Sequence, residues 1–182
     1  MTSMKNYKKA LFLDRDGVIN IDYGYVHKID NFTFVEGIFD LISLFQQAGY
    51  LIFIVTNQSG IGRGYYTEND FQTLSKWLKK QFRLRYIEIS EIYHCPHTPE
   101  TQCQCRKPQI GMLESCLKHY HIDLEHSFMI GDKPSDMAFA KQASIPNRIA
   151  ISTHPLTDAT YTFHSILECK HFFEESQGKI LL

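Results

Sequence analysis

The stretch ALFLDRDG, residues 10–17, passes from four apolar residues directly into two aspartates and a glycine. A short apolar run of this kind is typical of a buried β-strand whose end carries polar residues. The same form recurs at Leu51–Val55, and shorter strand candidates stand at Glu91–Tyr93, Phe128–Ile130 and Arg148–Ser152. These five predicted strands set the fold class.

Helical patterns separate the predicted strands. After the first strand, apolar residues recur at helical spacing before a stop at Gly49, namely Ile38, Leu41, Ile42 and Phe45. Thr67 begins a second helix, with Asp70 as its capping-box-like partner, and the inner face consists of Phe71, Leu74, Trp77, Leu78 and Phe82. Further helices are predicted at Met112–Tyr120 and Ser135–Ala143. Strands separated by helices favour parallel pairing, so we predict an α/β fold with a doubly wound, mostly parallel sheet.

Length and composition fit one domain over residues 1–182, because 43% of the chain is apolar and can form a sizeable core. The formal net charge of −1 gives no electrostatic reason to expect a nucleic-acid or membrane-surface partner. The polar opening MTSMKNYKK has no apolar signal core, and no stretch approaches a membrane span. We therefore expect a soluble, cytoplasmic protein. We also expect a monomer, although the sequence leaves the oligomeric state open. Clustered cysteines in that compartment bind metal more often than they cross-link.

The unusual polar residues follow the predicted strands. The first strand ends in Asp14–Gly17, the second in Thr56–Gly60 and the fourth in Gly131–Asp136, while Arg106 and Lys107 close the loop after the third. Ligands of doubly wound sheets bind at the carboxyl ends of the strands. Carboxylates gathered there would repel one another, and Mg²⁺ relieves that repulsion. Lysines with a hydroxyl and an amide suit a phosphoryl group. One such aspartate turn alone could be a solvated loop, but four polar strand ends in order indicate a site.

A loop at residues 94–108 carries the run CPHTPETQCQC, which has the pattern C-x-H-x5-C-x-C. Three cysteines and one histidine are a set that closes tetrahedral structural zinc sites, here Cys95, His97, Cys103 and Cys105. In extended backbone His94 would point the opposite way, so we exclude it. A disulfide between neighbouring cysteines would be strained, and a reactive thiol would need only one activated cysteine. The loop lacks large apolar side chains, so zinc would supply its folding energy and aim Arg106 and Lys107.

Four segments in chain order, LFLDRDGVIN, IVTNQSG, CRKP and MIGDKPSDM, are similar to the signature motifs of the haloacid-dehalogenase superfamily of phosphatases. Within it, DYGYVHKIDNF, TNQSGIGRGYYTENDF, CPH…CQCRKPQIGML and GDKPSDM resemble the D-glycero-D-manno-heptose 1,7-bisphosphate 7-phosphatases, over Lys9 to Ile151. The histidinol-phosphate phosphatases have a similar zinc loop and DRDG motif. Large caps of relatives are inserted after the first strand or before the third motif, and here those intervals are short. An open site without a large cap is therefore implied.

The resemblance implies a Mg²⁺-dependent phosphoric monoester hydrolase that removes the C7 phosphate of a heptose bisphosphate in lipopolysaccharide-core biosynthesis. Asp14 would attack phosphorus and Asp16 would act as acid and then base. Mg²⁺ would be held by Asp14, the Asp16 carbonyl and Asp132, with Asp136 in support. Thr56, Asn57 and Lys107 would stabilise the phosphoryl group. The remaining expected substrate contacts are Arg15, Gly17, Asp22, Tyr23, Gly24, Tyr25, Gln58, Ser59, Arg63, Arg106 and Lys133.

Some alternatives stay open. Tyr23 and Tyr25 could only pack their loop, and Arg63 could be solvated. The substrate could instead be histidinol phosphate or a broader set of small phosphate esters. A zinc-organised binding module without activity would make the pair Asp14 and Asp16 accidental. A nucleic-acid end phosphatase would need a basic stripe, which the chain lacks.

Overall fold

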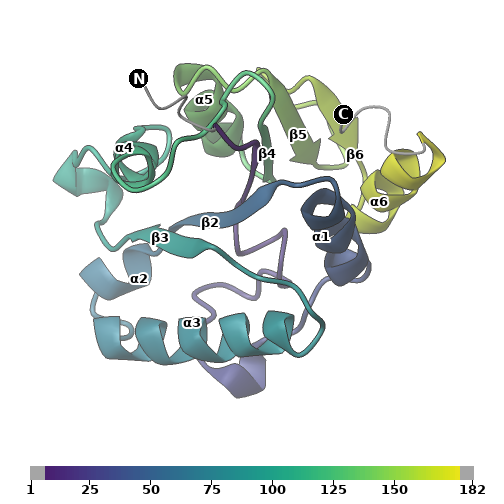
Figure 1. Ribbon diagram of the computed structural model, residues 1–182. Helices are drawn as coiled ribbons and strands as arrows, with labels where there is room; N and C mark the ends of the chain where they lie inside the picture. The colour runs from purple at the N-terminus through teal and green to yellow at the C-terminus, as the bar shows by residue number, and fades with distance from the viewer. Residues whose placement is uncertain (1–6, 177–182) are drawn as a thin grey trace, which may run out of the picture.

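The computed structural model describes residues 7–176 and has a six-stranded parallel sheet at its centre (Figure 1). The strand order is β3-β2-β1-β4-β5-β6, and every neighbouring pair is parallel. The strands are β1 (Ala10–Leu13), β2 (Leu51–Asn57), β3 (Glu91–Cys95), β4 (Phe128–Gly131), β5 (Asn147–Ile151) and β6 (Tyr161–Phe163). The predicted doubly wound sheet is confirmed, and all five predicted strands are present.

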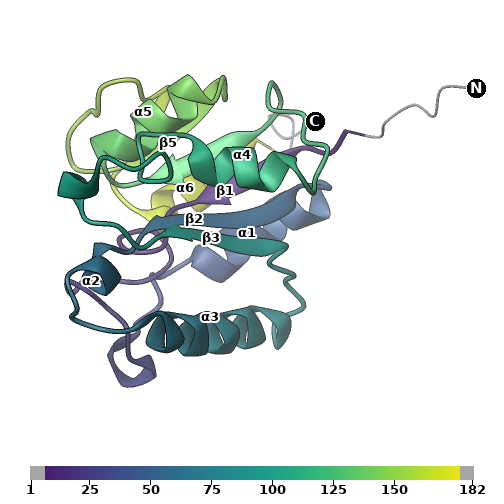
Figure 2. The same ribbon diagram turned by 90° about the vertical axis from the view of Figure 1, so that its left-hand side faces the viewer.

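Helices cover both faces of the sheet (Figure 2). They are α1 (Ile38–Gln47), α2 (Ser59–Gly62), α3 (Glu68–Arg83), α4 (Gly111–Leu117), α5 (Pro134–Gln142) and α6 (Ile166–Glu175), with short 3-10 helices at Ile29–Asn31 and Pro99–Thr101. The predicted capping box at Thr67 is confirmed, because its backbone N–H donates to the Asp70 carboxylate and its hydroxyl accepts from the Asp70 N–H. Strand β6 and helix α6 were not among the predicted elements.

Two apolar cores form because alternate residues of a strand face opposite sides of the sheet. Leu11 and Leu13 of β1 pack with α1, α3 and α6, whereas Ala10 and Phe12 pack with α4 and α5. All four β1 side chains are fully buried. A run buried on both faces explains why this strand is continuously apolar in the sequence.

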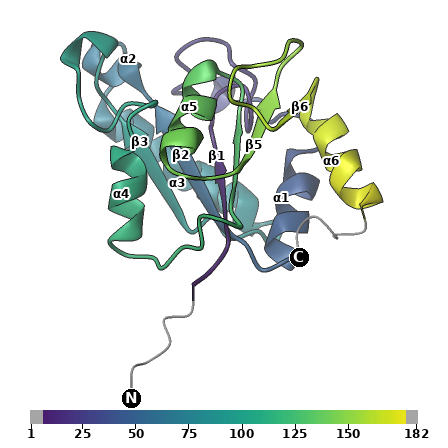
Figure 3. The same ribbon diagram turned by 90° about the horizontal axis from the view of Figure 1, so that it is seen from above.

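The sheet positions a site at one edge. All strands point the same way, but β2 and β3 are added on one side of β1 and β4 to β6 on the other; such a switch point leaves a crevice beyond the carboxyl ends of the strands. In Figure 3 the loop after β1, in purple, and α2 lie at the same end of the sheet. Only loops and the first 3-10 helix separate β1 from α1, so no large cap covers this edge. Among the described residues, no helix combines the length and apolar character needed to cross a membrane.

Candidate active site and metal centres

Acidic side chains gather where β1 and β4 end. The backbone N–H of Asp14 donates to the Ile130 carbonyl at 2.9 Å, which continues the pairing beyond β1. Carboxylate oxygens of Asp14, Asp132 and Asp136 all lie within 4.8 Å of one another. Gly17 allows this approach, because its φ is +89° and a Cβ there would lie 2.2 Å from Oδ2 of Asp132. The two predicted aspartate turns therefore meet.

Two observations show that the protein alone does not fully balance the negative charge of this cluster. Burial raises the pKa of Asp14 to about 6 and that of Asp132 to about 7. The Oδ1 atom of Asp132 is buried and has no hydrogen-bond partner. A hard divalent cation bound by oxygen ligands relieves both conditions, so the residues fit the predicted Mg²⁺ site.

Asp136 supports this site with both of its oxygens. Oδ2 accepts from the backbone N–H groups of Asp132, at 3.2 Å, and Lys133, at 3.0 Å. Oδ1 lies 2.6 Å from Nζ of Lys107. Although its carboxylate is near enough to join a metal cluster, these contacts occupy both oxygens. They suit the supporting position that the resemblance implies.

Lys107 is a buried cation at the centre of the site. Its Nζ donates to Oδ1 of Asp14 and to the Val55 carbonyl, both at 2.7 Å. Burial alone would lower the pKa of Lys107, but the carboxylates of Asp136 and Asp14 hold it above its usual value. The Asn57 side chain fixes the backbone of Lys107. Its Oδ1 accepts from the Lys107 N–H at 2.9 Å, and its Nδ2 donates to the Lys107 carbonyl at 3.2 Å. Asn57 thus positions Lys107, besides lining the cavity.

The four predicted zinc ligands come together in the loop after β3. Their ligand atoms all lie within 4.8 Å of one another, in Cys95, His97, Cys103 and Cys105. Three thiols and one imidazole are a donor set that fits Zn²⁺. The neighbouring His94 faces elsewhere, since its ring stacks on Phe71 at 4.1 Å and its Nε2 lies 3.0 Å from Oε2 of Glu68. Lys107 stands two residues after Cys105, the last of the four. The loop that holds the cluster therefore also carries Lys107.

A cavity of about 290 Å³ lies beside the acidic cluster. It is lined by Asp16, Asp22, Gly24, Tyr25, Asn57, Gln58, Ser59, Tyr66, Arg106, Lys133 and Ser135. A smaller hollow next to it reaches Asp14, Lys107 and Asp136. Two cationic side chains, Arg106 and Lys133, therefore line the cavity. Nζ of Lys133 lies 3.2 Å from Oδ2 of Asp22. Most of the predicted substrate contacts meet here.

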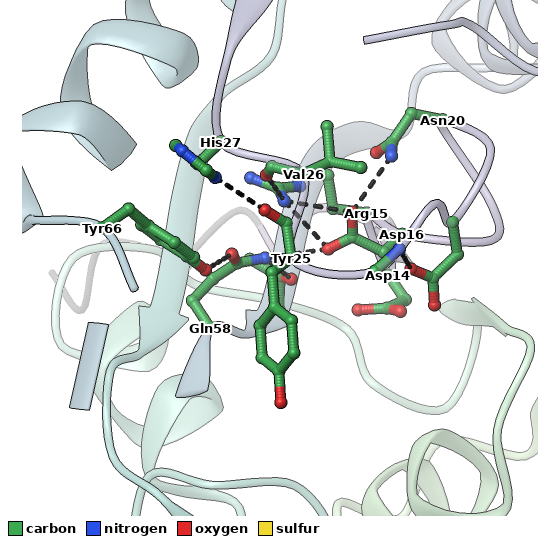
Figure 4. A network of polar contacts seen from close by, with 12 residues as sticks. Asp14, Arg15, Asp16, Asn20, Tyr25, Val26, His27, Gln58 and Tyr66 are labelled. Carbon is green, nitrogen blue, oxygen red and sulfur yellow. Dashed lines mark hydrogen bonds and ion pairs between the residues drawn. The ribbon is translucent and has the colours of Figure 1, made fainter. Parts of the chain in front are cut away.

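Asp16 is held by donors from three directions (Figure 4). Arg15 donates to both of its oxygens at 3.0 Å, Asn20 donates to Oδ1 at 3.0 Å, and Gln58 donates to Oδ2 at 3.0 Å. The Tyr66 hydroxyl donates to Oε1 of Gln58. The Asp16 carboxylate is thus held at the wall of the cavity.

Arg15 differs from the prediction that it contacts substrate. Its side chain is buried behind the turn, where it donates to Asp16 and, at 2.6 Å, to the Val26 carbonyl. The chain bends at Arg15, so its side chain lies inside while Asp14 and Asp16 reach the two hollows of the site. Arg15 therefore positions Asp16 and does not line the cavity.

Four other residues predicted to contact substrate or the phosphoryl group lie outside both cavities of the site, namely Gly17, Tyr23, Thr56 and Arg63. The Thr56 hydroxyl is buried and accepts from Nε2 of Gln58 at 2.8 Å. Arg63 lies 4.0 Å from Glu100. Tyr23 is exposed and lines a separate, larger hollow. Where these side chains lie depends on the paths of the loops after β1 and β2, which residue type alone does not reveal.

Two cavity residues were absent from the predicted site. Ser135 lies inside the motif GDKPSDM, so its place between predicted site residues could have indicated that it lines the cavity. Tyr66 follows the glycine-rich turn GIGRG and has no pattern of its own.

Comparisons with known proteins agree with this geometry. Residues 104–147 match the family model described as HAD-hydrolase-like. The D-glycero-beta-D-manno-heptose-1,7-bisphosphate 7-phosphatase of Helicobacter pylori is 45% identical over 93% of this chain and 96% of that protein. The D-glycero-alpha-D-manno-heptose-1,7-bisphosphate 7-phosphatase of Campylobacter jejuni is 46% identical over 92% of this chain and 96% of that protein.

A solved structure shares the fold. The D,D-heptose 1,7-bisphosphate phosphatase from B. bronchiseptica, complexed with magnesium and phosphate, superposes with a TM-score of 0.80 at 24% identity. The match covers 92% of this chain and 99% of that one.

Proposed function

This chain belongs to the haloacid-dehalogenase-like family of heptose 1,7-bisphosphate 7-phosphatases, and we propose that it hydrolyses the C7 phosphate of D-glycero-D-manno-heptose 1,7-bisphosphate. The observation that carries the chemistry is the buried Asp14 carboxylate, which lies 2.7 Å from the Lys107 ammonium beside a cavity with two further cations. The names of the similar proteins support the substrate class. The product would enter the synthesis of nucleotide-activated heptose.

In the proposed reaction an Asp14 oxygen attacks phosphorus in line, so a new P–O bond forms as the bond to the C7 oxygen breaks. Asp16 gives its proton to that leaving oxygen, and the sugar departs as an alcohol. Water then attacks the phosphoryl group on Asp14 and passes a proton to Asp16. This restores both carboxyl groups and releases inorganic phosphate. Lys107 stabilises the charge that spreads over the phosphoryl oxygens.

Metal ions complete the proposal. Asp14, the Asp16 backbone carbonyl and Asp132 would hold Mg²⁺, which when bound neutralises the gathered carboxylates and phosphoryl oxygens. Cys95, His97, Cys103 and Cys105 would hold a structural Zn²⁺ without an open position. Bound zinc would order the loop that carries Lys107. Arg106 and Lys133 would hold the anionic substrate.

The proposal is tested by measuring phosphate release from a panel with added Mg²⁺. The panel contains both anomers of the heptose bisphosphate, several hexose phosphates and histidinol phosphate. We expect the heptose bisphosphate to give the highest kcat/KM, and Asp14→Asn to abolish turnover because an amide cannot form the acyl phosphate. Faster turnover of histidinol phosphate would change the assigned substrate. Full activity in Asp14→Asn would contradict the covalent mechanism.

A further inference from the structure

A chain of hydrogen bonds leads from Tyr66 through Gln58 to Asp16 (Figure 4). The Tyr66 hydroxyl donates to Oε1 of Gln58 at 2.5 Å. Nε2 of the same amide donates to Oδ2 of Asp16 at 3.0 Å and to the Thr56 hydroxyl at 2.8 Å. One side-chain amide thus links a tyrosine outside the aspartate motifs to the carboxylate assigned to proton transfer.

The direction of these hydrogen bonds is fixed by Tyr66. Its side chain is 6% exposed, and burial raises its pKa to about 12. The phenol therefore keeps its proton and donates it, which requires the oxygen of the Gln58 amide to face Tyr66. The amide nitrogen then faces Asp16. The flipped amide would place its oxygen against the Asp16 carboxylate, where two acceptors would repel each other.

The Tyr66 ring is itself held in place. It stacks on the His27 ring at 4.8 Å between centroids, with 7° between the planes. His27 is anchored by a contact of 2.8 Å between its Nδ1 and the Tyr25 carbonyl. In addition, a Cβ at Gly60 would lie 2.1 Å from Cε1 of Tyr66, so the ring packs directly on the backbone of α2. Groups that align a catalytic side chain need this kind of support.

We propose that Tyr66 is a positioning residue, which acts through the Gln58 amide to aim the Asp16 carboxyl group at the leaving oxygen. The inference rests on the proposed function, in which Asp16 is the proton donor. Arg15 and Asn20 hold Asp16 from within the loop after β1, whereas Gln58 reaches it from the end of β2. Without the Tyr66 hydroxyl, Oε1 of Gln58 loses its donor and the amide is held only through its nitrogen. The restraint that Gln58 places on Oδ2 of Asp16 then weakens, which leaves Arg15 as the other donor to that oxygen.

The test is Tyr66→Phe, which keeps the ring and removes only the hydroxyl. Two substrates are compared by transient kinetics: heptose 1,7-bisphosphate, whose sugar oxygen needs a proton to leave, and 4-nitrophenyl phosphate, whose leaving group departs without one. We expect kcat for the bisphosphate to fall about tenfold and KM to change by less than about twofold. A tenfold fall is part of the rate acceleration that a general acid supplies. First-turnover release of 4-nitrophenolate should change by less than about twofold, since it bypasses the proton.

Controls separate this role from a structural one. Tyr65→Phe removes a hydroxyl from the adjacent, 58% exposed ring and should leave both rates unchanged. Gln58→Ala should reproduce the selective loss, and adding Tyr66→Phe to it should have little further effect, because both changes break the same chain. Equal losses on the two substrates in Tyr66→Phe would overturn the inference, as would additive losses in the double variant.

Asp16→Asn distinguishes the inference from the proposed function. A selective loss in Asp16→Asn together with unselective behaviour of Tyr66→Phe would overturn the positioning role alone. An equal loss on both substrates in Asp16→Asn would overturn the acid role of Asp16, and the positioning role with it.

Discussion

Replacing Lys107 by methionine should destabilise the protein severely, because it removes the only charge that faces two buried carboxylates from within 3 Å among the described residues. Nζ of Lys107 lies 2.7 Å from Asp14 and 2.6 Å from Asp136, and the side chains of all three residues are at most 7% exposed. Breaking a buried ion pair by removing one partner costs about 3–5 kcal/mol. This is a large share of the roughly 5–15 kcal/mol by which folded proteins of ordinary size are stable. With a slope of about 2 kcal/mol per molar urea, the unfolding midpoint should fall by about 1.5–2.5 M.

The loss should depend on pH with a definite sign. Burial raises the pKa of Asp14 to about 6 even though Lys107 opposes the shift, so removing the cation raises that pKa further. The folded variant then binds more protons than the unfolded chain, whose aspartate has a pKa near 3.8. A carboxyl group whose pKa is higher in the folded state destabilises that state fully at pH values above the folded pKa. Below the pKa of the unfolded chain it does not destabilise the folded state. The destabilisation should therefore shrink as the pH falls from about 8 to about 5.

Urea unfolding of Lys107→Met and of the unmodified chain, in buffer without Mg²⁺, measures this effect at both pH values. Lys79→Met is the matched control, because Lys79 lies 3.0 Å from Glu91 in a pair that is 29% and 47% exposed. Its loss should not exceed about 1 kcal/mol. A loss below about 1 kcal/mol for Lys107→Met, or an equal loss at both pH values, would refute the reasoning from buried charge.

Other changes should separate the two metal centres. Elemental analysis should find about one Zn²⁺ per chain, which His97→Ala loses and His94→Ala keeps because His94 pairs with Glu68; zinc retained in His97→Ala would contradict the ligand set. Gly17→Ala should lower stability by about 1–3 kcal/mol in urea unfolding and abolish Mg²⁺-dependent turnover, since its Cβ would meet Asp132, and full activity would show that the turn relaxes. Calorimetric Mg²⁺ affinity should fall as the pH drops through about 7 and then about 6, where protons compete for Asp132 and Asp14, and an affinity independent of pH would exclude these ligands.

The fold was largely predictable because buried parallel strands are continuous apolar runs. Strand β6 was not, since Tyr161–Phe163 has three residues and forms only against β5. Helix α6 does carry a signal: its buried residues Ile166, Cys169 and Phe173 stand at helical spacing, and Ser165 caps its first turn. A short amphipathic segment at the end of a chain is visible in sequence once its cap is considered.

The site divides in the same way. The residues of the two candidate metal clusters were predictable, because close spacing in the loop or a place after a strand fixes where each one lies. The contact of Tyr66 with Gln58 could not be predicted, since it depends on the path of the turn through Gly64, whose φ is +73°. No hydrophobic period describes such a turn.

The central place of β1 in the sheet bears on how the chain folds as it leaves the ribosome. β1 pairs with β2 on one side, but its other neighbour, β4, begins only at Phe128. A nascent chain that has emerged from the ribosome as far as Leu117 can assemble β3, β2 and β1, yet one edge of β1 then lacks its partner strand. Unpaired strand edges are the usual template for misassociation between chains. Chaperone contact during synthesis should therefore centre on β1, the strand that the finished protein hides completely.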